Sequence, residues 1–390
     1  MSNMSIGFPN VGLEFEMMGK AVHTAGLDIS YFGILVSAGL ILAMALVLLE
    51  AKRSRENTNY YLCAMLLGLL LGLVGARMYY VGCYYSFYEG NTKSILDIRS
   101  GGLALYGAVV GVMLAAALVS VSCRLSYSSM LDKLSLGFLT AVAVGRWGDF
   151  FNRASFGEYT DWYPAMRLPL SAVRSSEVTE LMRQNIVQIA GEDYIQVHPA
   201  FLYESVWCLL WLIILLVKNR KKLYDGQIFL HCFTAYCFGR CFTEWLRTDK
   251  MVLPVYQLPI NLYVSAGCFL LFLLIALGRG AMTKKRLQYV RQRRELKEEY
   301  EEKTRASRPS RNGSGFHDEE PAVQAALDSF DDDELARYME EYAEDDIPEA
   351  RRRSSDDKRT ERPEDSLFGD AFEEDIFPPT WKSPHHKNEL

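Results

Sequence analysis

Charged residues that interrupt apolar stretches are the residues of this sequence most able to do chemistry. Arg146 and Asp149 interrupt one stretch, and Arg240 and Glu244 interrupt another. Spacings of three and four residues place each pair on one face of a helix. An ionisable side chain is costly in hydrocarbon and indicates function unless it belongs to a structural ion pair. Spacing alone leaves both interpretations open, a pair that joins helices and an anion site.

Two further segments carry polar groups at the start of an apolar stretch. Gly101 and Gly102 precede one stretch, and Tyr106 follows four residues after the second glycine. Backbone N–H groups at a glycine-rich helix start suit a phosphate, whereas a tyrosine there equally fits an interfacial aromatic belt. His198, followed by proline, precedes another stretch, where we interpret it as a structural residue of the helix start.

Four arginines are expected to gather toward one side of a membrane, namely Arg77, Arg99, Arg146 and Arg240. This is more positive charge than one structural ion pair needs. The guanidinium fork matches the oxygens of a phosphate group. The arginines therefore predict an anionic lipid substrate.

The elements that must position these residues are apolar helices. A bilayer core of about 30 Å needs roughly 20 apolar residues in helical form. Candidate spans lie at residues 29–49, 60–82, 103–123, 134–151, 200–217, 226–246 and 257–278. The fourth and sixth are the least apolar, because they contain the two charged pairs. We predict an all-α integral membrane protein with about seven transmembrane helices.

Basic residues predict the orientation of these spans. Lysines and arginines cluster after the first, third, fifth and seventh spans, most densely in residues 218–222 and 284–294. The positive-inside rule then places the N-terminus outside and the C-terminal tail in the cytoplasm. Residues 152–199 are too long for a simple turn, so we expect a small extracytoplasmic head with strand-like pieces at 165–168 and 195–197.

The composition divides the chain into two parts. The whole chain has 390 residues, 49% hydrophobic, with a formal net charge of −6. Residues 1–280 are apolar, and we predict that they form the membrane domain. We predict that residues 281–390 form a charged, mostly disordered cytoplasmic tail, which begins with a basic helical stretch through Lys297. The eight cysteines show no CxxC pair and no Cys/His ligand spacing, so we expect neither a disulfide framework nor a metal site.

Taken in order, these motifs resemble the bacterial prolipoprotein diacylglyceryl transferases over roughly residues 25–280. The family pattern Gly-Arg-x-Gly-Asn-Phe-x-Asn-x-Glu, with a glycine three residues later, is similar to residues 145–154 and Gly157. The glycine pair 101–102, the His-Pro segment that runs to Glu204, and the pair Arg240 and Glu244 are also similar to family motifs.

The resemblance implies a transfer reaction at the bacterial cytoplasmic membrane, without a metal or organic cofactor. The diacylglyceryl group of phosphatidylglycerol moves to the thiol of the lipobox cysteine in a prolipoprotein signal peptide, a thioether forms, and glycerol phosphate leaves. The resemblance assigns catalysis to Tyr106, Arg240 and Glu244, with Tyr106 where some members have a histidine suggested as the base. It implies that Arg146 binds the lipid phosphate, and together with the reasoning from the residues we predict phosphatidylglycerol binding by Arg146, Asp149, Gly157, Arg77, Gly101 and Gly102.

Three departures from the family pattern keep other functions open. Asp149 stands where the family usually has asparagine, Ala154 where it has glutamate, and Phe32 where a tyrosine is common. One alternative is a paralogue impaired in catalysis that binds phosphatidylglycerol or lipoprotein signal peptides. The other is a transporter that uses the intramembrane charges, although the sequence shows no internal repeat that would support it.

Overall fold

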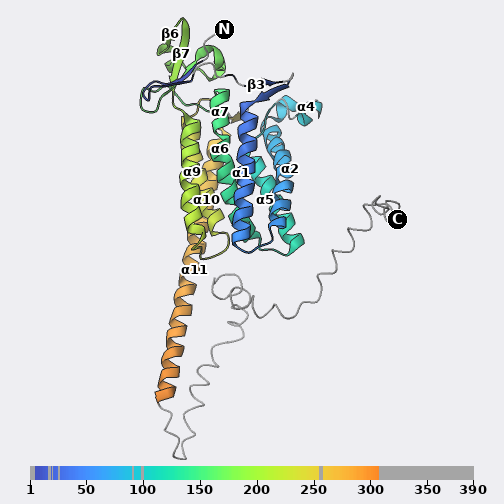
Figure 1. Cartoon of the computed structure of the whole chain (residues 1–390), viewed down its shortest axis with the longest axis vertical. Helices are drawn as coiled ribbons and strands as arrows, with labels where there is room; N and C mark the ends of the chain where they lie inside the picture. The colour runs from blue at the N-terminus through green and yellow to red at the C-terminus, as the bar shows by residue number, and fades with distance from the viewer. Residues whose placement is uncertain are drawn as a thin grey trace, which may run out of the picture. The chain divides into compact units, whose positions relative to one another are not determined.

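Seven long helices form the body of the molecule. The computed structural model describes residues 5–15, 19, 21–24, 27–89, 92–97, 101–253 and 258–306. The long helices run side by side in Figure 1 as α1 (Tyr31–Arg53), α2 (Thr58–Cys83), α5 (Leu105–Cys123), α6 (Tyr127–Gly145), α9 (Ala200–Asn219), α10 (Gln227–Leu246) and α11 (Ile260–Ala306). Each of them overlaps one of the predicted apolar stretches.

Five helical segments in the described part of the chain are long and apolar enough to cross a membrane. They are α1, α2, α5, α9 and Ile260–Gln292 of α11. The helices α6 and α10 are not among them, and both carry many buried residues, including charged ones. The chain is therefore a multi-pass membrane protein with a mostly helical fold, and the count of seven spans stays a prediction.

Glycines allow α2 and α5 to pack closely. A Cβ atom on Gly107 of α5 would collide with the backbone carbonyl of Gly75 on α2, and one on Gly111 would collide with that of Leu71. Small residues spaced four apart let helix backbones approach one another in a bilayer. This contact fixes α5, and with it Tyr106, against α2.

The fourth predicted span, 134–151, is not one helix. The helix α6 ends at Gly145, and a short helix α7 (Trp147–Asn152) follows after Arg146. The backbone N–H of Arg146 still donates to Val142, 3.0 Å away, while that of Asp149 donates to the carbonyl of Arg146 at 3.1 Å. The break leaves Arg146 at the junction of the two helices and not within either of them.

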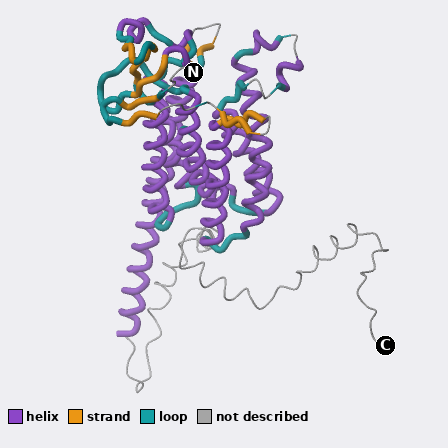
Figure 2. The backbone as a smooth tube through the Cα atoms, turned by 45° about the horizontal axis from the view of Figure 1, so that its top comes forward, coloured by secondary structure: helices purple, strands orange, loops and turns teal. Residues whose placement is uncertain are grey.

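A five-stranded antiparallel sheet caps one end of the helices, which we name the sheet end (Figure 2). Its order is β2 (Leu13–Phe15), β1 (Ile6–Phe8), β5 (Met166–Pro169), β7 (Glu192–Val197) and β6 (Val187–Ile189). The two predicted strand-like pieces pair with each other, with Met166 opposite Val197. The predicted head segment, residues 152–199, supplies three strands of this sheet, and residues 6–15 add two more that are too short to give a sequence signal.

Shorter elements complete the described chain. The hairpin β3 (Ala21–Thr24) and β4 (Leu27–Ser30) leads into α1, and β8 (Val252–Leu253) pairs with β9 (Leu258–Pro259) before α11. Between them lie α3 (Tyr85–Tyr88), α4 (Thr92–Leu96), two 3-10 turns at Leu170–Ala172 and Ser175–Glu177, and α8 (Glu180–Gln184).

The last helix continues far past the predicted boundary at residue 280. The helix α11 ends at Ala306, so the start of the tail is helical, and beyond Lys297 as well. Basic residues followed by residues of both charges, with no glycine or proline, sustain helix there. The rest of the tail prediction, residues 307–390, lies outside the described residues, as does Arg99.

At the end opposite the sheet, a buried carboxylate joins α6 to α10. The side chain of Asp132 accepts the backbone N–H groups of Phe229 at 2.9 Å and Gly226 at 3.0 Å, and the Lys222 ammonium lies 3.1 Å away. Gly226 has no side chain to cap α10, so Asp132 supplies the cap from another helix. Beside it, the Lys133 ammonium donates to Glu56 at 2.7 Å.

Candidate active site

A line of alternating charges crosses the sheet end of the bundle. We name it the charge chain, and its members are Asp149, Arg146, Glu204, Arg240, Glu244, Arg247 and Asp249. They come from α7 and its junction with α6, from α9, from α10 and from the loop after α10.

Glu204 is the centre of this chain. One of its oxygens lies 2.9 Å from Nη2 of Arg146, and the other lies 2.7 Å from Nη1 of Arg240. Tyr236 donates its hydroxyl hydrogen to the same carboxylate at 3.3 Å. The side chain of Glu204 is only 3% exposed, so the two guanidinium groups converge on one buried anion.

Each of these two arginines also forms an ion pair with a carboxylate close to it in the sequence. Nη1 of Arg146 donates to Asp149 at 2.9 Å, three residues along the chain, and Arg240 pairs with Glu244 one turn along α10. The shared helix face predicted from the spacing is confirmed for Arg240 and Glu244. Arg146 and Asp149 also pair, but Arg146 lies at the junction of α6 and α7 and not within one helix with Asp149. What spacing could not show is that Glu204 joins the two pairs.

The far end of the charge chain leaves the helix and reaches the head. The guanidinium of Arg247 lies 3.8 Å from Glu244 and donates to both oxygens of Asp249, at 2.8 and 2.9 Å. Burial of Asp249 raises its pKa, but the hydrogen bonds and the charge of Arg247 more than offset this and leave the pKa below its ordinary value. Asp249 also accepts the backbone N–H of Ser155 at 3.3 Å.

The residue after Glu204 holds α9 against the broken helix. The hydroxyl of Ser205 donates to the carbonyl of Ala143 at 2.7 Å and accepts the indole N–H of Trp147 at 3.1 Å. These bonds span the junction of α6 and α7. They fix the distance between Glu204 on α9 and Arg146 at that junction.

One hydrogen-bond donor of the charge chain is still available. The charge chain has one more carboxylate than guanidinium groups, and each of its arginines forms an ion pair. Nevertheless, among the described residues the buried Nε of Arg240 has no hydrogen-bond partner. A buried donor without a partner is unfavourable, so Arg240 can gain a hydrogen bond when an anion enters.

Tyr106 lies beside this arginine, on α5. Its hydroxyl forms a hydrogen bond with the hydroxyl of Ser265 on α11, and it also interacts electrostatically with Arg240. Ser265 in turn donates to the carbonyl of Asn261 at 2.5 Å. The structure thus brings the three predicted catalytic residues, Tyr106, Arg240 and Glu244, to one place.

Arg77 is occupied differently from the prediction. Its guanidinium donates to backbone carbonyls of Ser94 at 2.7 Å, Ile95 at 2.9 Å, Gly101 at 2.5 Å and Gly102 at 3.1 Å. These bonds use its fork to order the segment before α5. Arg77, Gly101 and Gly102 thus form a positioning device for the start of α5, and their binding of phosphatidylglycerol stays a prediction.

The two glycines of this device have conformational reasons to be glycine. Gly101 has a φ of +85° and Gly102 a φ of +72°, where side chains are strained. A Cβ on Gly102 would lie 2.6 Å from Nη1 of Arg77.

Gly157 lies where the head meets α10. Its N–H donates to the carbonyl of His198 at 2.8 Å, and its backbone bridges to Arg247. A Cβ there would stand 3.0 Å from both the Cβ of His198 and the carbonyl oxygen of Leu246. Gly157 therefore lets two backbones approach beside the charge chain. His198 also contacts the hydroxyl of Tyr203 through Nδ1 at 3.1 Å, in keeping with a structural role at the start of α9.

Three members of the charge chain were not assigned a role from the sequence: Glu204, Arg247 and Asp249. The available signal for Glu204 was a carboxylate in the first turns of an apolar stretch, which is costly without a partner. Arg247 and Asp249 lie in a loop, where charge is ordinary, so only the structure reveals them.

Comparison with known proteins decides the family. The family model described as prolipoprotein diacylglyceryl transferase matches residues 20–278. The chain belongs to this family.

Relatives with that activity in their names are similar over most of their length. The phosphatidylglycerol–prolipoprotein diacylglyceryl transferase of Clostridioides difficile (strain 630) is 34% identical over 228 residues, which are 58% of this chain and 82% of the relative. That of Clostridium novyi (strain NT) is 36% identical over 233 residues, 60% and 85% of the two chains. That of Listeria welshimeri is 30% identical over 260 residues, 66% and 87%.

The resemblance seen in the motifs is thereby confirmed. This prolipoprotein diacylglyceryl transferase family member carries its whole charge chain, Asp149 to Asp249, within the matched residues. The residues after 278 lie beyond the family match.

Proposed function

We propose that this protein transfers the diacylglyceryl group of phosphatidylglycerol to the lipobox cysteine of a prolipoprotein. A bond forms between the cysteine sulfur and the glycerol carbon that carries the phosphate ester. The carbon–oxygen bond to phosphate breaks, and glycerol phosphate leaves with the bonding electron pair. The thiol, with a pKa of about 8.5, gives up its proton to a base.

The observation that carries this proposal is the convergence of Arg146 and Arg240 on one carboxylate. Two guanidinium groups from different helices hold the two oxygens of Glu204 at 2.9 and 2.7 Å. A phosphate also presents two or more oxygens, one of which can accept a hydrogen bond from the free Nε of Arg240. Negative charge that develops on the departing phosphate is stabilised most strongly in such a buried, preorganised site.

The remaining site residues support this chemistry in distinct ways. Arg146 and Arg240 bind the phosphate, and Asp149 holds Arg146 in place. Glu244 and Tyr106 flank Arg240 and are the groups through which the thiol proton can leave. Arg77, Gly101 and Gly102 set the position of Tyr106, and Gly157 shapes the approach between head and α10.

The orientation follows from the same reaction. The signal peptide of a prolipoprotein crosses the bacterial cell membrane, so its cysteine is at the outer face when the mature part has been exported. We therefore place the sheet end outside. The basic residues 218–222 and 284–294 then lie on the cytoplasmic side, as the positive-inside rule requires.

A transfer assay with purified protein tests this function. Protein in detergent receives phosphatidylglycerol and a lipobox peptide, and mass spectrometry follows the mass of the peptide and the release of glycerol phosphate. We expect a diacylglyceryl adduct on the cysteine and none on a peptide with serine in its place. If the protein binds both substrates but yields no adduct beside an active relative, the proposal is wrong and a binding paralogue is the better description.

A further inference from the structure

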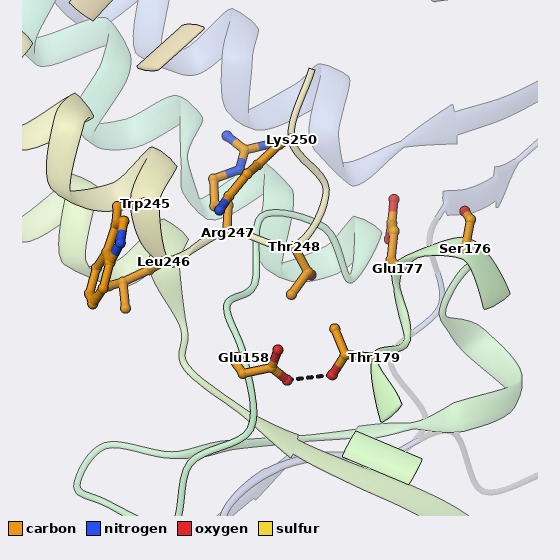
Figure 3. Close-up of a pocket in the computed structure, with 9 residues that line it drawn as sticks. All are labelled: Glu158, Ser176, Glu177, Thr179, Trp245, Leu246, Arg247, Thr248 and Lys250. Carbon is orange, nitrogen blue, oxygen red and sulfur yellow. Dashed lines mark hydrogen bonds between the residues drawn. The ribbon is translucent and has the colours of Figure 1, made fainter. Parts of the chain in front are cut away.

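A cavity of about 280 Å³ lies between the head and the end of α10 (Figure 3). One side is formed by residues 245–248 and Lys250, at and after the end of α10. The other side is formed by residues of the head: Glu158, Ser176, Glu177 and Thr179. The volume is close to the lower limit for ligand sites, which is roughly 300 Å³, and suits a short stretch of chain.

The cavity adjoins the reacting centre through Arg247. This residue lines the cavity and also lies 3.8 Å from Glu244, the neighbour of Arg240. Arg247 follows Glu244 by three positions, which is about 4.5 Å along the axis, and Arg240 lies about 6 Å further back. An extended peptide covers about 3.3–3.6 Å per residue. An occupant of the cavity is therefore one to three residues away from the level of Glu244 and Arg240.

The charges of the cavity disfavour an anion. Arg247 already holds Asp249 through two hydrogen bonds, and two carboxylates, Glu158 and Glu177, face the space. A phosphate group would meet these carboxylates. The head groups of anionic lipids are thus poor occupants.

The same groups suit a polypeptide. Thr248 adds a hydroxyl group to the lining, Thr179 donates its own hydroxyl hydrogen to Glu158, and Lys250 adds a positive charge opposite the carboxylates (Figure 3). Such a mixed lining can bind backbone N–H and C=O groups together with side chains of either charge. Trp245, which is 66% exposed, stands at the rim, where an indole fits a membrane–water interface.

We infer that this cavity binds the prolipoprotein residues that directly follow the modified cysteine. The inference rests on the proposed function and adds to it a second substrate subsite. The cysteine lies at the level of Arg240 and Glu244, and the second or third residue after it enters the cavity between Lys250 and Glu158. Lys250 then favours an acidic side chain at this position.

Binding of a non-reactive peptide tests the inference apart from catalysis. A fluorescent lipobox peptide with serine in place of cysteine is titrated against the full chain in detergent. Ser176→Trp fills the cavity from an exposed 3-10 turn, and Gln184→Trp adds the same bulk on the exposed end of α8 as a control. We expect Ser176→Trp to raise the peptide Kd about tenfold and Gln184→Trp to leave it unchanged.

A charge reversal sharpens the test. Lys250→Glu is compared with Arg183→Glu, an exposed position on α8 outside the cavity. Peptides carry aspartate, serine or lysine at the second and third positions after the cysteine site. Lys250→Glu should weaken the aspartate peptide and strengthen the lysine peptide, each about fivefold, with little change for serine. Arg183→Glu should shift none of them.

The outcomes separate this inference from the proposed function. A peptide Kd that does not respond to Ser176→Trp, or a charge preference that Lys250→Glu leaves unchanged, overturns the cavity assignment even if transfer is active. If Ser176→Trp instead raises only the KM for phosphatidylglycerol, the cavity holds the lipid head group and the inference is wrong. Peptide binding that follows the expected pattern without any transfer would leave the cavity intact and refute the reaction.

Discussion

The helices α6 and α10 meet at two buried ionic clusters, and the clusters differ in what satisfies them. At the end opposite the sheet, Asp132 binds two backbone N–H groups and the Lys222 ammonium. At the sheet end, the partners of Glu204 among the described residues are side chains, namely the guanidinium groups of Arg146 and Arg240 and the hydroxyl of Tyr236. Backbone donors cannot move without unfolding a helix, whereas side chains can exchange one anion for another.

This difference teaches how one pair of helices serves two purposes. The Asp132 cluster is a cap and holds the fold, since its partners belong to the helix start itself. The charge chain has spare capacity in the free Nε of Arg240 among the described residues. Variants at the Asp132 cluster should therefore lower stability alone, whereas variants of the charge chain should lower activity, and also stability where they remove the shared carboxylate.

Glu204→Gln should have the largest effect. It leaves two buried guanidinium groups without their shared carboxylate, which costs about 3–5 kcal/mol. The melting temperature in detergent, followed by tryptophan fluorescence, should fall far more than for Glu56→Gln, which removes the charged partner of Lys133 at the other end. Equal falls in melting temperature for the two variants would mean that the shared carboxylate contributes no more to stability than the ion pair at the other end.

Arg240→Lys should affect activity next most strongly. Lysine keeps the charge but lacks the fork that reaches Glu204, Glu244 and a phosphate together. We expect kcat/KM for transfer to fall about 10²–10³-fold, measured as the initial rate of adduct formation at equal amounts of folded protein. Lys133→Arg, a conservative change at the opposite end, is the control and should keep the wild-type rate.

Asp132→Asn should show the reverse pattern. The amide is a weaker acceptor for two N–H groups and cannot pair with Lys222, so the free energy of unfolding should fall by about 1.5–3 kcal/mol. Below the melting temperature, kcat and the KM values for both substrates should stay at wild-type levels. A specific loss of kcat would remove the distinction between the two ends.

Asp249→Asn should have the smallest effect, and one that depends on pH. The pKa of Asp249 lies below its ordinary value, so the ionised group contributes stability above about pH 4 and loses it as the pH falls through the lowered pKa. Wild type should exceed Asp249→Asn by about 1 kcal/mol near neutral pH, and the gap should close below pH 4. Melting curves from pH 7 to 3 measure it, and a gap that is constant over this range would contradict the assignment.

The sequence predicted the long helices of the described residues and two ion pairs of the charge chain. Apolar length located each of these helices, and the spacing of Arg146 with Asp149 and of Arg240 with Glu244 indicated that the members of each pair lie close together. Spacing within a helix carries no information about which helices are neighbours, so the link through Glu204 was missed. The same limit explains why the partners of Arg77 were not predicted: they are backbone carbonyls of Ser94, Ile95, Gly101 and Gly102.

The predicted element boundaries were wrong where the local sequence signals were weak or absent. The break after Gly145 has no proline, and the strands at residues 6–8 and 13–15 are only three residues long. The helix α11 passed residue 280 because hydropathy marks where an apolar span ends, whereas helix propensity continues through the charged residues that follow.

The central claim is that chemistry occurs at the charge chain and that the opposite cluster only holds the fold. The single-turnover rate of adduct formation, measured for Arg240→Lys and Asp132→Asn in one preparation of phosphatidylglycerol and lipobox peptide, tests it most directly. The account predicts a rate near wild type for Asp132→Asn and one about 10²–10³-fold lower for Arg240→Lys. Equal rates for the two variants, or a slower rate for Asp132→Asn, would contradict it.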